Sequence, residues 1–208
     1  MRPWPLETPW TPLGRLTLAL LAGLGWAAPL AADDLGPGLD LKAGVAVPLS
    51  PLGHNSFSQA YTSATQPDVA LTYRVDPAWQ LGLELQLAGF NHESVAQTTL
   101  STWGCGLVGE WDFDPEAQGD QDHLYAQLGL GAGGAQLRTD ALYQSRQWTS
   151  FCGHLTFGWE QPLTGWTSLL AEVRAWLLVG PGSTDPIATG SVSLGLRFGF
   201  PPKDGAAR

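Results

Sequence analysis

Pairs of a histidine and a hydroxyl residue two positions apart are the first candidates for chemistry in this chain. The spacing occurs in His54-Asn55-Ser56, in His92-Glu93-Ser94 and between His154 and Thr156. Alternate residues of a strand share one face, as a nucleophile and its base must. Only His154 and Thr156 lie within an expected strand, with Glu160 and Glu172 as candidate acids, whereas the other two pairs fall in expected loops. The sequence therefore provides one weak candidate for nucleophilic catalysis.

Metal and cofactor motifs are weaker still. His92-Glu93 lacks the second histidine of a zinc protease helix, and Cys152-Gly153-His154 offers two ligands where a structural zinc site needs four. No glycine motif for phosphate or dinucleotide binding is present. We expect neither a metal nor a cofactor.

The two cysteines, Cys105 and Cys152, invite a disulfide in an oxidising compartment. Alternation places Cys105 on an apolar face and Cys152 on a polar face, with another strand between them. Their Cα atoms are then expected to lie beyond the limit of about 7 Å for a disulfide. Two free thiols are the expected outcome.

Charge is scarce and acidic. Charged residues make up 14% of the chain, with 10 Lys and Arg against 19 Asp and Glu. An average soluble domain carries about 25%. Nucleic-acid binding needs a basic footprint, which the sequence lacks.

The elements that must position these residues are strands, because apolar and polar residues alternate throughout the chain after residue 38. Leu81, Leu83, Leu85 and Leu87, for example, are separated by Gln80, Gly82, Glu84 and Gln86. Eight such segments can be delimited, at residues 39–47, 69–75, 80–87, 98–113, 123–136, 147–160, 168–179 and 191–200. The expected fold is therefore all-β, an eight-stranded antiparallel up-and-down barrel.

Alternation alone allows two barrels that are inside-out versions of each other. In a soluble lipocalin-like barrel the leucine faces line a dry cavity. In an outer-membrane barrel they face lipid, and the polar faces fill the lumen. The first form would make the protein a soluble binder.

Three observations favour the transmembrane form. The polar faces hold mainly Gly, Ser, Thr and Gln, which suits a crowded lumen better than a solvated surface. Tight connections at 76–78 and 162–165 contrast with a long polar one at 51–66, although the connection at 114–122 is longer than this pattern predicts. Aromatic residues also gather at segment ends, as expected of interfacial belts. One belt comprises Tyr73, Trp79, Trp111, Phe113, Phe157, Trp159, Trp166, Phe198 and Phe200, and the other Phe90, Trp103, Tyr143 and Phe151.

With this pattern of strands, residues 38–200 resemble the small eight-stranded outer-membrane barrels of the outer-membrane protein A and X type. The resemblance lies in strand number, alternation and a last strand ending at Phe200, where such barrels tend to carry an aromatic assembly signal. It implies outer-membrane lipid, lipopolysaccharide and the barrel assembly machinery as partners. The tail at 201–208 departs from the pattern, because the aromatic residue is not terminal.

The inward faces of such a barrel would carry a set of charged and titratable side chains. They are Asp40, Lys42, Arg74, Glu84, Glu110, Asp112, His154, Glu160, Glu172, Arg174 and Arg197. Buried charges must be paired, so a lumen charge network is expected. A narrow polar passage is the alternative, and a wide pore is disfavoured because eight strands leave room only for side chains.

The chain is expected to comprise a signal peptide at 1–32, the barrel at 33–200 and a short polar tail at 201–208. Arg2 and Arg15 precede the apolar run 16–26, and alanines at 27–32 provide a cleavage site. The run is shorter than the roughly 20 residues of a transmembrane helix. An even strand number puts both ends of the barrel on the periplasmic side, so 51–66, 90–97, 137–146 and 180–188 would face outward.

The expected function is a structural or surface-interaction role of a monomeric, non-enzymatic outer-membrane barrel. A narrow channel for ions or small solutes is the second hypothesis. The third is lipid A modification, because a deacylase among the eight-stranded barrels is similar in carrying a His-x-Ser pair and an acid. Here Thr156 stands in the place of that serine.

Overall fold

The computed structural model describes residues 36–49, 61–93, 95, 98–115, 121–139, 144–179 and 186–199, with only the backbone of 144–146. These residues form eight strands. Their bounds are β1 Pro37–Leu49, β2 Ala64–Asp76, β3 Trp79–Asn91, β4 Thr98–Asp112, β5 His123–Thr139, β6 Gln144–Thr164, β7 Thr167–Val179 and β8 Ile187–Gly199. Among the described residues there is no helix long and apolar enough to span a bilayer.

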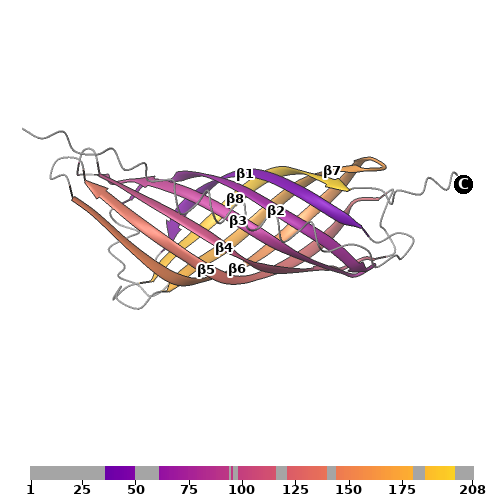
Figure 1. The fold of residues 1–208 in the computed structure, drawn as a ribbon. Coiled ribbons are helices and arrows are strands. Elements are labelled where there is room, and N and C mark those ends of the chain that lie inside the picture. The colour runs from indigo at the N-terminus through magenta and orange to yellow at the C-terminus, as the bar shows by residue number, and fades with distance from the viewer. Residues whose placement is uncertain are drawn as a thin grey trace, which may run out of the picture. The chain divides into compact units, whose positions relative to one another are not determined.

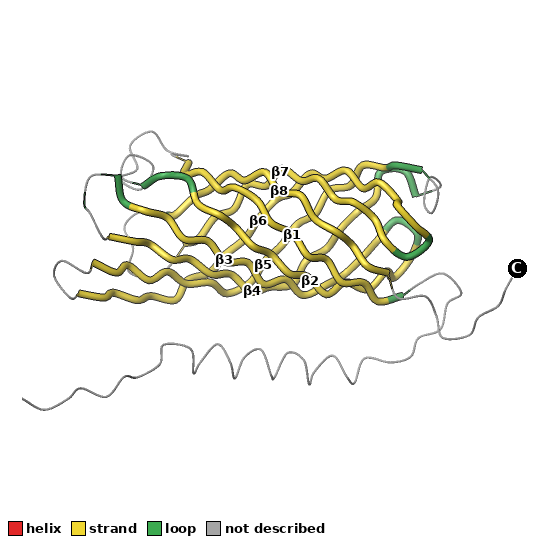
Figure 2. Tube along the Cα trace, turned by 90° about the horizontal axis from the view of Figure 1, so that it is seen from above, coloured by secondary structure: helices red, strands yellow, loops and turns green. Residues whose placement is uncertain are grey.

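Each strand pairs antiparallel with its neighbour in the chain, and β8 pairs with β1 to close the barrel (Figures 1 and 2). The closing seam runs from Gly38 opposite Gly199 to Leu49 opposite Ala188. We call the end where β2–β3, β4–β5 and β6–β7 are joined the turn end, and the opposite end the loop end. The expected eight-stranded antiparallel barrel is thereby confirmed.

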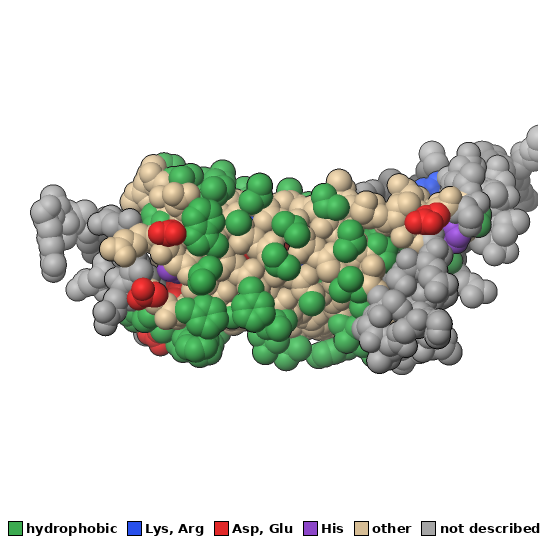
Figure 3. All heavy atoms as spheres, turned by 180° about the vertical axis from the view of Figure 1, so that it is seen from behind, with side chains coloured by type: hydrophobic (Ala, Val, Ile, Leu, Met, Phe, Trp, Pro, Cys, Tyr) green, Lys and Arg blue, Asp and Glu red, His purple; other side chains and the backbone are tan. Residues whose placement is uncertain are grey.

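The sidedness of the strands separates the two forms of barrel. Outward-facing apolar side chains are exposed, with Leu107 at 68% and Val192 at 62%, whereas the inward Asp40 and Glu110 are at 0% and 1%. Apolar side chains are spread over the visible face of the barrel wall, and charged ones show near its two ends (Figure 3). The barrel is thus apolar outside and polar inside, as membrane-spanning barrels are.

Several strands are longer than the alternation predicted. β2 begins at Ala64 rather than 69, and β6 runs to Thr164, through the expected tight turn at 162–165. The true turn there is at Gly165 and Trp166, and the register shifts between Pro162 and Thr164. A bulge of this kind keeps proline within a strand end. At the loop end, strands also cover parts of all four segments expected as outer loops.

The aromatic residues confirm one belt better than the other. At the turn end Trp79, Trp111 and Phe113 are exposed, and the Trp79 and Trp111 rings stack at 6.2 Å. At the loop end Phe151 is exposed, but Phe90 is completely buried in the lumen. The assignment of Phe90 to a belt was wrong because it used the position along the strand and ignored the parity. Tyr143 and Phe200 lie outside the described residues, as do His54-Asn55-Ser56, Ser94, the segment 1–32 and the tail 201–208.

Candidate functional site

The lumen has two halves of different chemistry. The half towards the turn end holds nearly all of the buried charges. The half towards the loop end holds an apolar cluster that includes Phe90, Trp176 and Leu178. Every second residue of a strand faces inward along its whole length. The strands therefore contribute to both halves, and the boundary between the halves crosses them.

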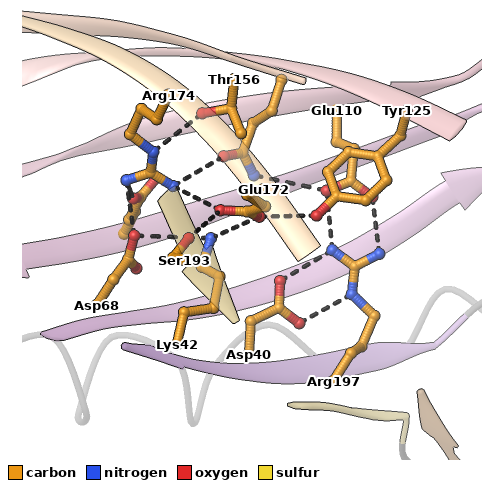
Figure 4. A network of polar contacts seen from close by, with 12 residues as sticks. Asp40, Lys42, Asp68, Glu110, Tyr125, Thr156, Glu172, Arg174, Ser193 and Arg197 are labelled. Atoms are coloured by element: carbon orange, nitrogen blue, oxygen red, sulfur yellow. Dashed lines mark hydrogen bonds and ion pairs between the residues drawn. The ribbon is translucent and has the colours of Figure 1, made fainter. Parts of the chain in front are cut away.

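Arg197 organises the charges nearest the turn end (Figure 4). Its Nε and Nη2 donate to the two oxygens of Asp40, both at 2.9 Å, in a bidentate pair. Nη1 and Nη2 also donate to the Glu110 carboxylate at 2.7 and 2.8 Å, and Nη1 donates to Glu160 at 2.6 Å. One guanidinium from β8 therefore ties together carboxylates from β1, β4 and β6 (the Arg197 group).

Arg174 on β7 organises a second group deeper in the lumen. Its Nη1 donates to Asp68 at 2.6 Å and to Gln86 at 2.8 Å, and it also contacts Glu84. Its Nη2 donates to Glu172 at 3.3 Å. With Lys42, these residues form the Arg174 group.

Lys42 extends the Arg174 group across to β1. Its Nζ lies 3.1 Å from Glu172 Oε1 and 3.6 Å from Asp68 Oδ2. The Lys42 side chain passes beside Gly195, its partner residue on β8, where an added Cβ would lie 2.5 Å from Lys42 Cγ. The group therefore draws on four strands of the barrel.

Tyr125 joins the two groups. Its hydroxyl donates to Glu172 Oε1 at 2.7 Å, and its ring lies 5.6 Å from the Arg197 guanidinium carbon. At the turn end His123 Nε2 is 3.4 Å from Asp112 and 3.7 Å from Glu160, and Arg74 pairs with Asp112 at 3.3 Å. The contacts form one network from the turn end to the middle of the barrel.

Acids outnumber bases in this network. Among the described residues seven carboxylates are buried, with three buried Lys and Arg side chains. Arg74 adds a fourth cation with a side chain 19% exposed. Each buried guanidinium must therefore serve several carboxylates, which explains the multiple contacts of Arg174 and Arg197. A charge removed from such a site leaves its partners uncompensated in a medium of low dielectric constant.

Two large inward side chains occupy space that glycine leaves on the neighbouring strand. His154 is paired with Gly129, and Tyr125 with Gly158. A Cβ on either glycine would overlap the ring that lies over it. Glycine in a strand marks such close approaches. These two glycines are thus required by the side chains of the network.

The histidine and threonine singled out in the sequence do lie together. His154 Nδ1 is 3.2 Å from Thr156 Oγ1, and His154 Nε2 is 2.9 Å from Glu84 rather than near Glu160 or Glu172. However, Thr156 is completely buried, and its hydroxyl accepts a hydrogen bond from Arg174 Nε at 2.9 Å. Glu84 therefore belongs to the Arg174 group, and the histidine and the threonine hydroxyl are each held by a member of that group.

The space beside His154 is small. A cavity of about 20 Å³ is lined by Glu84, Gln86, Cys152, Trp176 and several glycines of β4 and β5. A water molecule needs roughly 10–15 Å³ on the same measure, so the cavity holds about one. It has no room for an acyl chain or a sugar.

Every residue predicted for the lumen faces inward. Nine of the eleven are buried, and Arg74 and His154 are half-buried. Sequence reasoning missed Asp68, His123 and Tyr125. Asp68 has the inward parity but lies one residue before the segment as first delimited, and His123 opens its segment. Tyr125 lies between the outward Leu124 and Ala126 and so has the inward parity, but it carries no charge that would mark it for the network.

The described cysteines and acids are not arranged as a metal site. Cys105 and Cys152 are both free. Within the described ranges, no group of three or more His, Cys, Asp and Glu is arranged to hold a metal ion. The contacts that the described inward residues make are ion pairs, hydrogen bonds and apolar packing.

Comparison with known proteins identifies the class of fold. No protein-family model and no curated protein sequence matches the chain. Among solved structures, the barrel resembles neisserial surface protein A, with 19% identity and a TM-score of 0.60, over 79% of this chain and 97% of the other. It also resembles Ail, the attachment invasion locus protein of Yersinia pestis, with 12% identity and a TM-score of 0.51, over 81% and 100% of the two chains. The outer membrane protein OprG of Pseudomonas aeruginosa is similar too, with 12% identity and a TM-score of 0.51, over 81% and 98%. The fold is that of the small eight-stranded outer-membrane barrels.

Proposed function

We propose that this protein is a non-enzymatic barrel of the outer membrane with a structural or surface-interaction role. The observation that carries the proposal is a closed barrel whose wall is apolar outside and whose lumen is filled by paired charges and by the apolar cluster. A filled lumen leaves the outer wall and the loop end as the surfaces available for contact.

The proposal includes the route and the orientation. A signal peptide at 1–32 directs export, the barrel assembly machinery inserts the chain, and lipid and lipopolysaccharide surround it as a monomer. The turn end faces the periplasm, because both ends of an even-stranded barrel lie on one side. Short turns on the periplasmic side and longer loops outside are the usual arrangement of such barrels.

The name of one structural neighbour supports the surface-contact form of the proposal. Ail is an attachment invasion locus protein, and its structure has also been solved with the heparin analogue sucrose octasulfate. For the present chain we carry over only the idea of surface contact, and we assign that contact to the loop end. The binding of wild-type cells and of cells lacking the protein to a host-cell layer tests it, and equal binding would restrict the role to the membrane itself.

The channel hypothesis has less support. The apolar cluster brings Phe90, Trp176 and Leu178 together in the lumen, each less than 5% exposed. An ion would lose its hydration water in such a desolvated region, and the buried polar side chains beside the cluster, such as Thr102 and Thr189, carry no charge to compensate for the loss. A channel would need these side chains to move apart.

The enzyme hypothesis is also disfavoured by the geometry at His154. The threonine hydroxyl is buried and engaged by Arg174, and the adjacent cavity admits about one water. The test is the lipid A mass spectrum of cells with and without the protein. We expect identical spectra; a mass change that His154→Ala abolishes would establish the enzyme.

The first experiment is cell fractionation combined with a comparison of unheated and heated samples on a gel. We expect the protein in the outer-membrane fraction, resistant to urea extraction, with a shift in mobility on heating. Recovery as a soluble periplasmic protein without a shift would contradict the proposal.

A further inference from the structure

The Arg174 group contains one acid more than it has cations. Its cations are Lys42 and Arg174, and its acids are Asp68, Glu84 and Glu172. The side chain of each is at most 5% exposed. A buried carboxyl group without a compensating charge avoids the cost of burial by keeping its proton. The group therefore needs one additional proton, either on an acid or on the adjacent His154.

The hydrogen bonds around His154 are satisfied with a neutral ring. A guanidinium only donates, so Thr156 Oγ1 accepts from Arg174 Nε at 2.9 Å. The threonine hydroxyl can then donate to His154 Nδ1, which lies 3.2 Å away. With Nδ1 as an acceptor, the ring carries its proton on Nε2, which lies 2.9 Å from Glu84 Oε2. This arrangement needs no positive charge on the imidazole, which leaves the acids to carry the additional proton.

Glu172 and Glu84 each have a donor at both carboxylate oxygens. Glu172 accepts from Lys42 at Oε1, at 3.1 Å, and from Arg174 at Oε2, at 3.3 Å. Glu84 Oε1 accepts from Arg174 Nη1, and its Oε2 faces His154 Nε2. An ionised carboxylate accepts at each oxygen, so both acids are placed as carboxylates.

Asp68 differs from these two acids. Its Oδ2 accepts from Arg174 Nη1 at 2.6 Å (Figure 4) and lies 3.6 Å from Lys42 Nζ, but its Oδ1 is buried without a hydrogen-bond partner. The Asp68 and Glu84 side chains are nevertheless in hydrogen-bond contact with each other. Ionised carboxylates only accept, so a hydrogen bond between two of them requires a proton. A proton on Asp68 supplies the donor that this contact needs.

We propose that Asp68 and Glu84 form an acid pair that shares one proton, carried by Asp68 and donated towards Glu84. The charged groups around Asp68 are Lys42 from β1, Glu84 from β3 and Arg174 from β7, and Lys42 in turn binds Glu172 of β7. With the shared proton the Arg174 group balances, with two cations, two carboxylates and one neutral acid. The pair is a proton-binding site inside the lumen, separate from the role proposed for the outer surface.

The shared proton makes folding depend on pH. An unfolded aspartate is ionised above about pH 4. In the folded barrel Asp68 keeps its proton, so folding takes up one proton between that pH and the higher pH at which the pair ionises. The folded state then binds more protons than the unfolded chain, and the free energy of unfolding that Asp68 contributes falls as the pH rises over this range.

The first test measures urea unfolding of the full-length protein, refolded in lipid vesicles, between about pH 5 and 7. In Asp68→Asn an amide N–H replaces the acid O–H and can donate to Glu84, but it cannot take up a proton. We expect the unfolding constant of wild type, divided by that of Asp68→Asn, to rise roughly tenfold per pH unit. Asp114→Asn, the same change at an exposed residue, should give a constant ratio. A constant ratio for Asp68→Asn as well would overturn the acid pair.

Infrared spectroscopy of the folded wild-type protein detects the proton directly. A protonated carboxyl group gives a C=O band that is distinct from the bands of a carboxylate. We expect such a band at neutral pH, shifted when the aspartates carry a heavy carbon isotope and missing in Asp68→Asn. If no acid band responds to labelled aspartate, Asp68 is ionised and the proposal is overturned. A band that responds only to labelled glutamate would likewise remove the proton from Asp68.

The nitrogen chemical shifts of His154 complete the test. We expect a neutral ring with its proton on Nε2 at neutral pH. A doubly protonated ring would place the additional proton on the histidine and overturn the acid pair. Cell fractionation tests the proposed function separately, so either proposal can fail while the other stands.

Discussion

The two halves of the lumen share the same strands but are stabilised in opposite ways. Towards the turn end, Arg197 and Arg174 each hold several carboxylates from different strands. Towards the loop end, the apolar cluster packs around Phe90, Trp176 and Leu178. In the charged half, the stability lost when a side chain is removed depends on which charges then stay unpaired. In the apolar half, it depends on how much volume the side chain filled.

The largest expected effect breaks the charged half. Arg197→Met keeps much of the volume but leaves Asp40, Glu110 and Glu160 without their shared cation. We expect a loss of about 3–5 kcal/mol in the free energy of unfolding. Arg74→Met removes a single, partly exposed pair and should cost at most about 1 kcal/mol. Urea unfolding in lipid vesicles, followed by tryptophan fluorescence, measures both, and equal losses would contradict the network.

The next effect concerns the apolar half. Leu178→Ala opens a cavity in the cluster and should lower the free energy of unfolding by about 2–4 kcal/mol. Its neighbour Leu177 faces outward and is 41% exposed, so lipid can follow the smaller side chain in Leu177→Ala. A clearly smaller loss for that control is expected in the same unfolding assay. A reversed order would mean that the cluster does not pack as described.

A smaller effect sharpens the role of glycine in the charged half. Gly158→Ala places a Cβ against the Tyr125 ring and should cost about 1–3 kcal/mol. Gly109→Ala adds its Cβ on the outward face, where the nearest atom would be a Leu81 methyl carbon at 3.8 Å. Thermal gel-shift midpoints compare the two variants. If they are equally stable, Tyr125 is free to move away and does not bridge the two groups.

The smallest effect reports on the edge of the apolar half. Tyr61 packs against the cluster, and burial raises its pKa above the ordinary value. Because its pKa is raised, the Tyr61 hydroxyl keeps its proton to a higher pH in the folded protein than in the unfolded chain. The free energy of unfolding therefore falls as the pH rises above about 10. The difference between the ultraviolet titrations of wild type and Tyr61→Phe isolates this group. A midpoint at or below the ordinary tyrosine value would show that Tyr61 is solvated.

The fold could be predicted from the sequence because alternation gives the number of strands and the residues that share a face. The choice of the outward face came from other signals, namely the few charges on the polar faces, the aromatic belts and the lengths of the connections. The leucines at 81, 83, 85 and 87 fix one face, and the whole barrel follows from repeating that rule. Strand ends were less predictable. β2 starts five residues earlier than expected, because Pro67 and its polar neighbours weaken the pattern while pairing with β1 extends the strand.

The site could be predicted as a set of inward residues but not as partners. Parity assigns Arg197 and Asp40 to the lumen, yet only the closing of β8 onto β1 brings them together. The Arg174 to Asp68 contact crosses the lumen between β7 and β2, and no spacing in the sequence encodes it. The end of the β2–β3 ladder at Asp68 opposite Gln86 is likewise a property of pairing, which local patterns do not specify.

The division of the lumen is tested most directly by conductance. Purified protein, refolded and inserted into a planar lipid bilayer, should give no steps in current, because the apolar cluster closes the lumen beyond the charge network. Reproducible single-channel steps from the wild-type protein would contradict a sealed lumen and establish the channel in its place.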